Sequence, residues 1–255
     1  MKRHRLMAAV ALLAVSTYLP LKAASEVPSY IAAAVADSAR PADEKAQDVH
    51  RKPGQVLAFV GIKPGDKVVD LMPGAGYYTR IFSKIVGPHG AVYAVQPVEM
   101  DKVNPSRLKS LRSFAGNADY PNVTVSVPPI ANMQLPKGVD IVWTSQNYHD
   151  LHDPFMGSPN MLRINKAIYD ALKPGGLYIV LDHAAAAGTG VTKTNDLHRI
   201  DPAAVKAEVT AAGFQFVGES EVLRNPADDH TLAIFNPKIK GETDKFIYKF
   251  RKPLQ

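Results

Sequence analysis

The sequence predicts an α/β domain with a mostly parallel sheet that is covered by helices on both faces. Short apolar, β-branched runs alternate with segments whose apolar residues recur every three or four positions. The early runs are apolar at almost every position, which is typical of strands buried on both faces. With 255 residues, 46% of them hydrophobic and 21% charged, the chain is long enough to form one such domain with a full core.

The expected strands are short and follow turn-forming residues. Residues 67–71 come after a Lys-Pro-Gly-Asp turn, and 139–144 are apolar apart from Asp140. Two later segments alternate polar and apolar residues, which favours an antiparallel pair at the end of the domain. The expected strands are 67–71, 91–95, 123–125, 139–144 and 177–181, followed by the antiparallel pair 214–222 and 245–250.

The helices are expected between these strands, where proline and glycine mark their ends. Residues 26–50 are alanine-rich and charged, and we expect two helical pieces broken at Pro41. Later helices begin where a capping side chain precedes proline, a residue favoured at the first helical position. They are expected at 55–60 and 78–86 and after Asn104-Pro105, Ser158-Pro159 and Asp201-Pro202, the last closed by Gly213.

The turn after the first strand carries the strongest functional signal. A β-branched run ends at Asp70, passes through Pro-Gly-Ala-Gly at 73–76 and enters an amphipathic segment. The glycines allow a tight turn and leave room for a ligand, and the first N–H groups of the helix favour an anionic group. Because α/β folds bind nucleotide-type cofactors in this way, we expect a cofactor site here.

The amino-terminal residues have the pattern of a bacterial export signal. Basic residues at 2–5 precede an apolar run at 6–21, and small residues follow at 23–25. We expect residues 1–24 to be a cleaved signal peptide, residues 25–255 to form one domain and the protein to be periplasmic. The alternatives are an uncleaved membrane anchor and a buried helix.

Charge and cysteine content exclude several classes of function. The formal net charge falls from +6 to +2 when the four basic residues of the predicted signal are removed. The remaining domain therefore gives no electrostatic case for binding nucleic acid, and membrane contact is expected only through the signal or anchor. The absence of cysteine excludes disulfides, thiolate metal sites and cysteine nucleophiles.

Four stretches of the chain carry a resemblance to a known family. They are the glycine turn at 70–79, Asn-Tyr-His-Asp-Leu at 147–151, Leu-Lys-Pro-Gly-Gly at 172–176 and the tail at 240–253. With the strand order, they make the chain resemble class I S-adenosylmethionine-dependent methyltransferases, in particular predicted bacterial ones with export signals. The resemblance implies a Rossmann-like, seven-stranded sheet with an antiparallel last strand, and methyl transfer to an unidentified small-molecule acceptor.

The resemblance also implies a set of residues that bind S-adenosylmethionine. Asp70 would bind its amino group, and Gly74 would give its methionine part access to the backbone. Gln96 stands where the family usually has an acid for the ribose hydroxyls, Ile130 would pack on the adenine, and Met72 replaces a usual glycine. The predicted set is Asp70, Met72, Pro73, Gly74, Gly76, Tyr77, Thr79, Gln96, Ile130 and Asn147.

The loop after the fourth strand is expected to border the transferring methyl group. His149 titrates near neutrality and is a candidate base for a hydroxyl acceptor, with Asp150 orienting it. Tyr148 is expected to line the methyl pocket. The alternative is an exposed polar loop without function.

For several residues the sequence leaves two interpretations open. His198 and Arg199 either close over an anionic substrate or form a structural ion pair, and Asp48 and Arg51 either pair on the surface or lie beside the cofactor. No metal is predicted, but the spacing does not exclude a metal-assisted hydrolase. The side chains that could form such a metal site are His149, Asp150, His152, Asp153, Asp182 and His183.

A binding role without catalysis is the alternative to methyl transfer. Met72 and Gln96 depart from the family pattern, and a cytoplasmic cofactor is not ordinarily available outside the inner membrane. A ligand-binding protein of the cell envelope on a methyltransferase scaffold would account for both.

Overall fold

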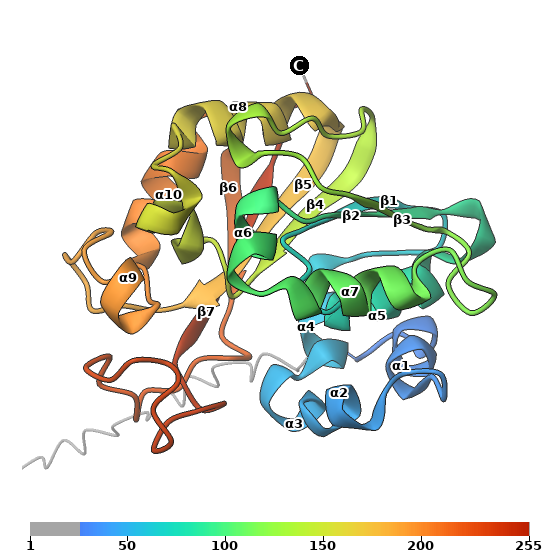
Figure 1. Ribbon diagram of the computed structural model, residues 1–255, viewed down its shortest axis with the longest axis horizontal. Coiled ribbons are helices and arrows are strands. Elements are labelled where there is room, and N and C mark those ends of the chain that lie inside the picture. Colours follow the sequence, from blue (N-terminus) through green and yellow to red (C-terminus); the bar gives the residue numbers. More distant parts are fainter. Residues whose placement is uncertain (1–25, 255) are drawn as a thin grey trace, which may run out of the picture.

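The computed structural model describes residues 26–254, so the predicted signal at 1–24 lies outside the described residues. The described residues form a seven-stranded sheet in the order β3-β2-β1-β4-β5-β7-β6 (Figure 1). Neighbouring strands from β3 to β5 are parallel, whereas β7 is antiparallel to both β5 and β6. This confirms the predicted sheet with its antiparallel last strand.

The elements have the following bounds. The strands are β1 Lys67–Leu71, β2 Ala91–Val95, β3 Val123–Ser126, β4 Val139–Ser145, β5 Leu172–His183, β6 Gln215–Ser220 and β7 Lys245–Arg251. The α-helices are α1 Ser29–Ala36, α2 Ala42–Ala46, α3 Asp48–Arg51, α4 Pro53–Val60, α5 Tyr77–Val86, α6 Val98–Val103, α7 Pro105–Phe114, α8 Met161–Ala171, α9 Thr194–Leu197 and α10 Pro202–Ala211. The 3-10 turns are η1 Gly87–His89, η2 Ile130–Asn132, η3 His149–His152 and η4 Pro154–Met156.

Several helical regions differ from the prediction, and the short helices α6 and α9 were not expected. The helix expected after Ser158 begins at Met161, because the Asn160 side chain accepts a hydrogen bond from the backbone N–H of Arg163 at 3.0 Å and caps it. The amino-terminal region contains three short helices before Arg51, whereas two pieces were expected.

The central strands β1 and β4 are buried on both faces, as their apolar runs predict, whereas the edge strand β6 is partly exposed. Successive residues of a strand point to opposite faces. In β1, Val68 packs in the core formed with α1, α4, α5 and α7, whereas Val69 packs in the core formed with α8 and α10. In β4, Trp143 and Val142 divide between the same two cores.

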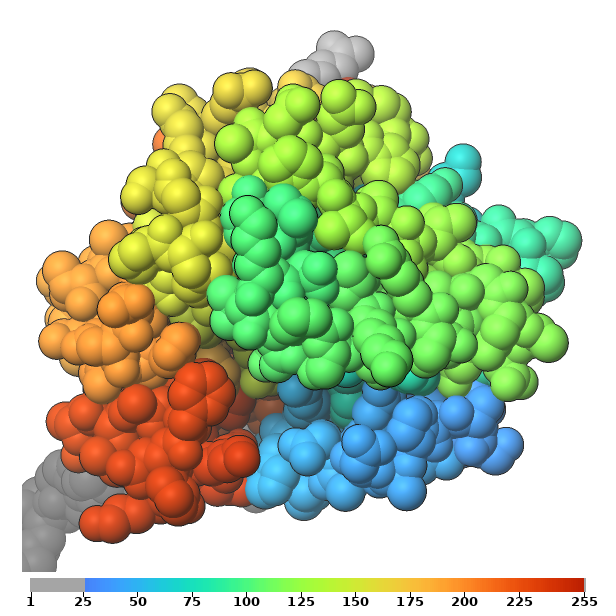
Figure 2. Space-filling model, in the orientation of Figure 1, coloured from blue at the N-terminus to red at the C-terminus, as the bar shows by residue number. Residues whose placement is uncertain are grey.

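Two segments far apart in sequence meet near the carboxyl ends of the strands. His50 Nδ1 lies 2.7 Å from Glu242 Oε1, and Lys52 Nζ donates to the carbonyl of Val222 at 2.9 Å. The amino-terminal helices and the segment 223–244 therefore lie side by side, blue and red in Figure 2. Within residues 26–254, no helix combines the length and the apolar character needed to cross a membrane.

Candidate functional site

A cavity of about 720 Å³ lies at the carboxyl edge of the sheet, a volume typical of small-ligand and cofactor sites. Its walls come from the glycine turn, the ends of β4 and β5, the helices α2, α3, α6 and α7, and the segment around Phe235. The predicted site residues that line it are Asp70, Met72, Pro73, Gly74, Tyr77, Asn147, His149 and Asp150. Those outside its lining are Gly76, Thr79, Gln96, Ile130 and Tyr148.

Met72 adopts a left-handed backbone conformation with φ of +57°. For a residue with a side chain this conformation costs about 1–2 kcal/mol. Its N–H donates to the carbonyl of Val95 at 2.9 Å, and its carbonyl accepts from Asn147 Nδ2 at 2.6 Å. Met72 therefore keeps the backbone shape that a glycine would supply, while its side chain packs in the core.

The two glycines of the turn have different roles. Gly74, at φ +60°, lines the cavity, and the nearest atom to an added Cβ would be Arg107 Cδ at 3.9 Å. Gly76, at φ +98°, packs against α7, because an added Cβ would lie 2.5 Å from Phe114 Cζ. Gly74 leaves the backbone open to a ligand, whereas Gly76 allows two helices to approach.

Asp70 places a buried carboxyl group at the end of β1. Its Oδ2 accepts a hydrogen bond from Thr79 Oγ1 at 2.6 Å. Burial raises the pKa of Asp70 to about 7, against the lowering effect of the Thr79 hydroxyl. Thr79 is itself buried and holds the carboxyl group in place. The site therefore offers an acid that ionises near neutral pH and can pair with a cationic ligand group.

Asp48 connects the amino-terminal helices to the glycine turn. Its carboxylate accepts two hydrogen bonds from Arg40, at 2.7 and 2.9 Å, and one from the Tyr77 hydroxyl. Arg51 lies over the Tyr77 ring, 4.4 Å from its centroid, and lines the cavity. The partner of Asp48 is thus Arg40 and not Arg51. Asp48 and Arg51, the predicted pair, both lie beside the site.

Gln96 and Ile130 lie outside the main cavity. Gln96 is fully buried at the end of β2, and within residues 26–254 no group bonds either polar atom of its side chain. Ile130 lines a separate cavity of about 110 Å³ beside α8, and its N–H donates to the Glu99 carboxylate. The structure therefore does not place Ile130 against a ligand in the main cavity, because the chain after β3 turns toward α8.

His149 is buried and is oriented by Asp182 at the end of β5. The Asp182 carboxylate accepts from the His149 backbone N–H at 2.8 Å and lies 2.9 Å from Nδ1. On the other side of the ring, Nε2 lies 3.4 Å from Asp150 Oδ1. The orienting partner is thus Asp182, where the sequence predicted Asp150. Asp150 lies at the nitrogen that faces the cavity.

The pKa of His149 reflects two opposing effects. Burial lowers it, but the Asp182 carboxylate, with a smaller effect from Asp150, raises it to about 9. The carboxylates therefore favour the protonated ring over what burial alone would allow. The role of His149 as a base for a hydroxyl acceptor stays a prediction.

Tyr148 points into the core and lies outside the lining of the main cavity, although the sequence predicted that it lines the methyl pocket. Its hydroxyl donates to Glu208 Oε2 at 2.8 Å and accepts from Asn165 Nδ2 at 3.0 Å. The turn at the end of β4 directs Tyr148 into the core and His149 toward the cavity.

Of the two predicted interpretations of Arg199, the structure shows the structural ion pair. It is fully buried and donates to both oxygens of Asp228, at 2.8 and 3.0 Å. It also donates to the carbonyls of Ala184 and Leu232, both at 2.9 Å. Its neighbour His198 lines the cavity instead.

Two residues at the end of β5 belong to the site although the sequence did not predict them as binding or catalytic residues. Asp182 orients His149, and His183 lines the cavity with its Nδ1 2.8 Å from Thr243 Oγ1. Burial holds the pKa of His183 well below its usual value. Their sequence signal is an Asp-His pair that directly follows an apolar strand at the same sheet edge.

The sequence around the glycine turn matches a family of methyltransferases. Residues 42–126, one third of the chain, match the family described as protein-L-isoaspartate(D-aspartate) O-methyltransferase. The match includes the glycine turn and the strands β1 and β2.

Longer matches are to proteins named ubiquinone/menaquinone biosynthesis C-methyltransferase. A ubiquinone/menaquinone biosynthesis C-methyltransferase (UbiE) of Hydrogenovibrio crunogenus is 31% identical over 183 residues, covering 69% of this chain and 65% of the relative. The protein of the same name from Saccharophagus degradans is 26% identical over 180 residues, covering 69% of this chain and 67% of the relative. The chain thus spans about two thirds of the length of these relatives.

Solved structures share the fold. The structure of a SAM-dependent methyltransferase from Aquifex aeolicus has a TM-score of 0.58 and 20% identity, covering 83% of this chain and 98% of that one. This structural similarity confirms the Rossmann-like methyltransferase fold.

Proposed function

We propose that the chain is a class I S-adenosylmethionine-dependent methyltransferase that transfers the methyl group to a small-molecule acceptor. The observation that carries the proposal is the glycine turn. Gly74 of this turn and the carboxyl group of Asp70 line the cavity at the sheet edge. The sequence matches around this turn and the fold agree with it.

The residues of the cavity fit the cofactor. Trp143 Nε1 and Ser145 Oγ are buried polar atoms of its walls without a partner within residues 26–254, so a polar ligand would satisfy them. Asp70 would hold the ammonium group, and the N–H groups at the start of α5 would hold the carboxylate. When bound, the cofactor supplies an electrophilic methyl group on a sulfonium sulfur. Met72 does not prevent these groups from binding the cofactor. This removes one reason for the alternative of a binding protein without catalysis.

The acceptor side of the cavity is formed by the loops after β4, β5 and α9. His149, Asp150 and His198 lie there, and the chain's own contribution is to position the acceptor. The relatives are C-methyltransferases of quinone biosynthesis, which supports a cyclic acceptor that is methylated at carbon.

Titration calorimetry with S-adenosylhomocysteine tests the cofactor site. We expect saturable binding of one molecule per chain. No binding at millimolar concentration would overturn the proposal. Release of S-adenosylhomocysteine from S-adenosylmethionine in the presence of candidate quinone precursors distinguishes an enzyme from a binding protein.

Asp70→Asn should weaken S-adenosylhomocysteine binding about tenfold to 100-fold near pH 8, because a hydrogen-bonded charge is lost. In the native protein, affinity should rise as the pH passes through about 7, where the Asp70 carboxyl group ionises. The variant should lack this rise, and any slope that it keeps reports the ligand's own titration. Asp119→Asn, an exposed acid outside the cavity, is the matched control. Equal pH profiles for the native protein and Asp70→Asn would contradict the role of Asp70.

The same carboxyl group should affect stability without ligand. The folded state has the higher pKa, so between about pH 4 and pH 7 it binds more protons than the unfolded state. The free energy of unfolding should therefore fall as the pH rises through this interval. Asp70→Asn should remove most of that fall, which urea unfolding at several pH values measures.

We also propose that residues 1–24 direct export and that the domain acts in the periplasm. The basic cluster and the apolar run of this segment support it. Cell fractionation, with sequencing of the mature amino terminus, tests this proposal. Protein confined to the cytoplasm with an intact amino terminus would contradict it.

A further inference from the structure

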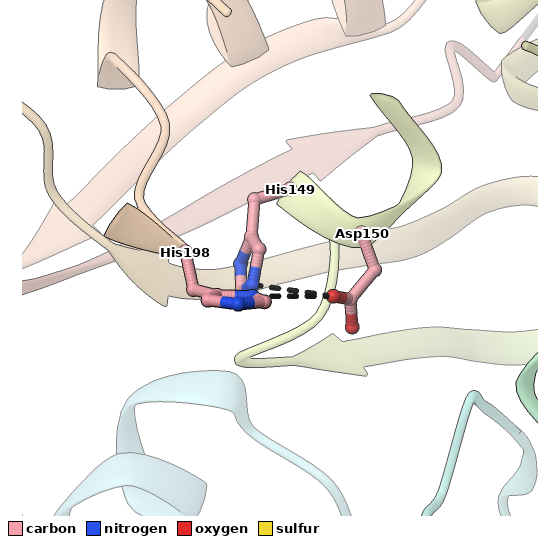
Figure 3. Close-up of side chains that lie close together, drawn as sticks. All are labelled: His149, Asp150 and His198. Atoms are coloured by element: carbon pink, nitrogen blue, oxygen red, sulfur yellow. Dashed lines mark ion pairs between the residues drawn. The ribbon is translucent and has the colours of Figure 1, made fainter. Parts of the chain in front are cut away.

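Three side chains on the acceptor side of the cavity form a compact cluster of metal-ligand types. His149 Nε2 lies 3.4 Å and His198 Nδ1 lies 3.9 Å from Asp150 Oδ1, and one ligand atom from each residue lies within 4.8 Å of the others. Figure 3 shows the two rings converging on the carboxylate. Ligand atoms about 2 Å from a tetrahedral ion are roughly 3.3 Å apart, so small side-chain adjustments would suffice.

The histidine rings are positioned by contacts outside the cluster. Asp182 lies 2.9 Å from His149 Nδ1, which leaves Nε2 directed at Asp150. A carboxylate behind a histidine is the usual arrangement that orients a metal ligand. His198 has a left-handed backbone with φ of +53°, and its N–H donates to the carbonyl of Thr194 at 2.9 Å. Its ring packs edge-on against His149 and Phe235, with centroids 5.5 and 4.9 Å apart.

The cluster faces open space. All three residues line the main cavity, and their side chains range from 2% exposed for His149 to 29% for His198. Three protein ligands with a cavity beside them would leave coordination positions for water or a ligand oxygen, as in catalytic rather than structural sites.

We propose that His149, Asp150 and His198 bind a divalent transition-metal ion that coordinates an oxygen of the acceptor. Two imidazoles and one carboxylate favour ions such as Zn²⁺ or Fe²⁺ over Mn²⁺, Mg²⁺ and Ca²⁺, which prefer oxygen ligands. The acceptor class would be a hydroxylated or carbonyl-bearing small molecule. Of the six side chains that the sequence offered for a metal site, two belong to this cluster, and His198 is added from the loop after α9. The metal site itself rests on the geometry alone, while its role toward an acceptor rests on the proposed methyl transfer.

Metal titration of the chelator-treated full chain tests the site. We expect one Zn²⁺ per chain by calorimetry, and a Co²⁺ visible spectrum with nitrogen and oxygen ligands. His198→Ala and Asp150→Asn should each weaken Zn²⁺ binding about 100-fold. His152→Ala is the matched control, because His152 lies in the same turn but pairs with Glu208. It should bind like the native protein.

The outcomes separate the two proposals. No Zn²⁺ binding, or unchanged binding in both His198→Ala and Asp150→Asn, would overturn the metal site. Loss of folding in one variant, seen by circular dichroism, leaves the decision to the other variant and to the Co²⁺ spectrum of the native chain. Metal binding without S-adenosylhomocysteine binding would keep the metal site and overturn the methyltransferase. The reverse result would overturn only the metal site.

Discussion

Gly74→Leu should reduce the affinity for S-adenosylhomocysteine roughly 100-fold or more, equivalent to about 2.7 kcal/mol. At Gly74 an added Cβ has only Arg107 Cδ within 4 Å, at 3.9 Å, so the rest of the side chain would extend into the cavity. The leucine would occupy the space beside the backbone groups that are expected to hold the methionine part of the cofactor. Calorimetric titration of the purified variant measures the loss.

Backbone strain must be separated from blockage of the site. Gly74 has φ of +60°, and a leucine there costs about 1–2 kcal/mol of conformational energy whatever it contacts. Gly138 offers a matched control, because its φ is +71°, an added Cβ meets nothing within 4 Å, and it lies outside the cavity lining. Gly138→Leu should lose a similar amount of stability in urea unfolding and keep its affinity. If the two variants bind equally well, Gly74 does not face the cofactor.

The parts of the fold that follow from local pattern could be predicted from the sequence. The central strands are apolar on both faces and lie between turn residues, and both signals are contained in a few neighbouring positions. The glycine turn is equally local, since its strand, its glycines and its helix start are consecutive. This explains why β1, the turn and the position of Gly74 agree with expectation.

Some predicted site residues lie elsewhere than expected, because long-range packing determines their positions. The direction of Tyr148 depends on Glu208 and Asn165, which are 60 and 17 residues away in the chain. Gly76 was expected at a ligand, but the helix that approaches it is α7. The sequence motif contains both glycines but does not show which one is covered by a neighbouring helix.

The acid–histidine pairing at the site shows the same limit. His149 and Asp150 are adjacent in sequence, so a direct pair is the simplest expectation. The parallel pairing of β4 and β5 instead brings Asp182 to His149 Nδ1 and leaves Asp150 on the cavity side. The strand order predicts that the two strand ends are neighbours, but the contact depends on side-chain geometry at the turn.

The ion pair of Arg199 and Asp228 should be the most sensitive point for stability near the site. Both side chains are almost fully buried, at 0% and 1% exposed. Arg199→Ala would leave the Asp228 charge buried without its partner, which typically costs about 3–5 kcal/mol. It would also remove the hydrogen bonds to Ala184 and Leu232, which join the end of β5 to the segment 223–244. Urea unfolding should show this loss, whereas the exposed Arg112→Ala should change stability by less than about 0.5 kcal/mol.

A double-mutant cycle identifies the cause of that loss. Asp228 also accepts hydrogen bonds from the backbone N–H groups of His230 and Asp244, at 3.1 and 2.6 Å. Asn in its place carries no charge and can still accept one of these bonds through Oδ1, whereas its Nδ2 cannot accept the other. Arg199→Ala combined with Asp228→Asn should therefore lose about 1–2 kcal/mol less stability than the sum of the two single losses. If the two losses simply add, the cost of Arg199→Ala comes from packing and carbonyl contacts. In that case charge pairing between Arg199 and Asp228 is not what keeps the segment 223–244 beside His198.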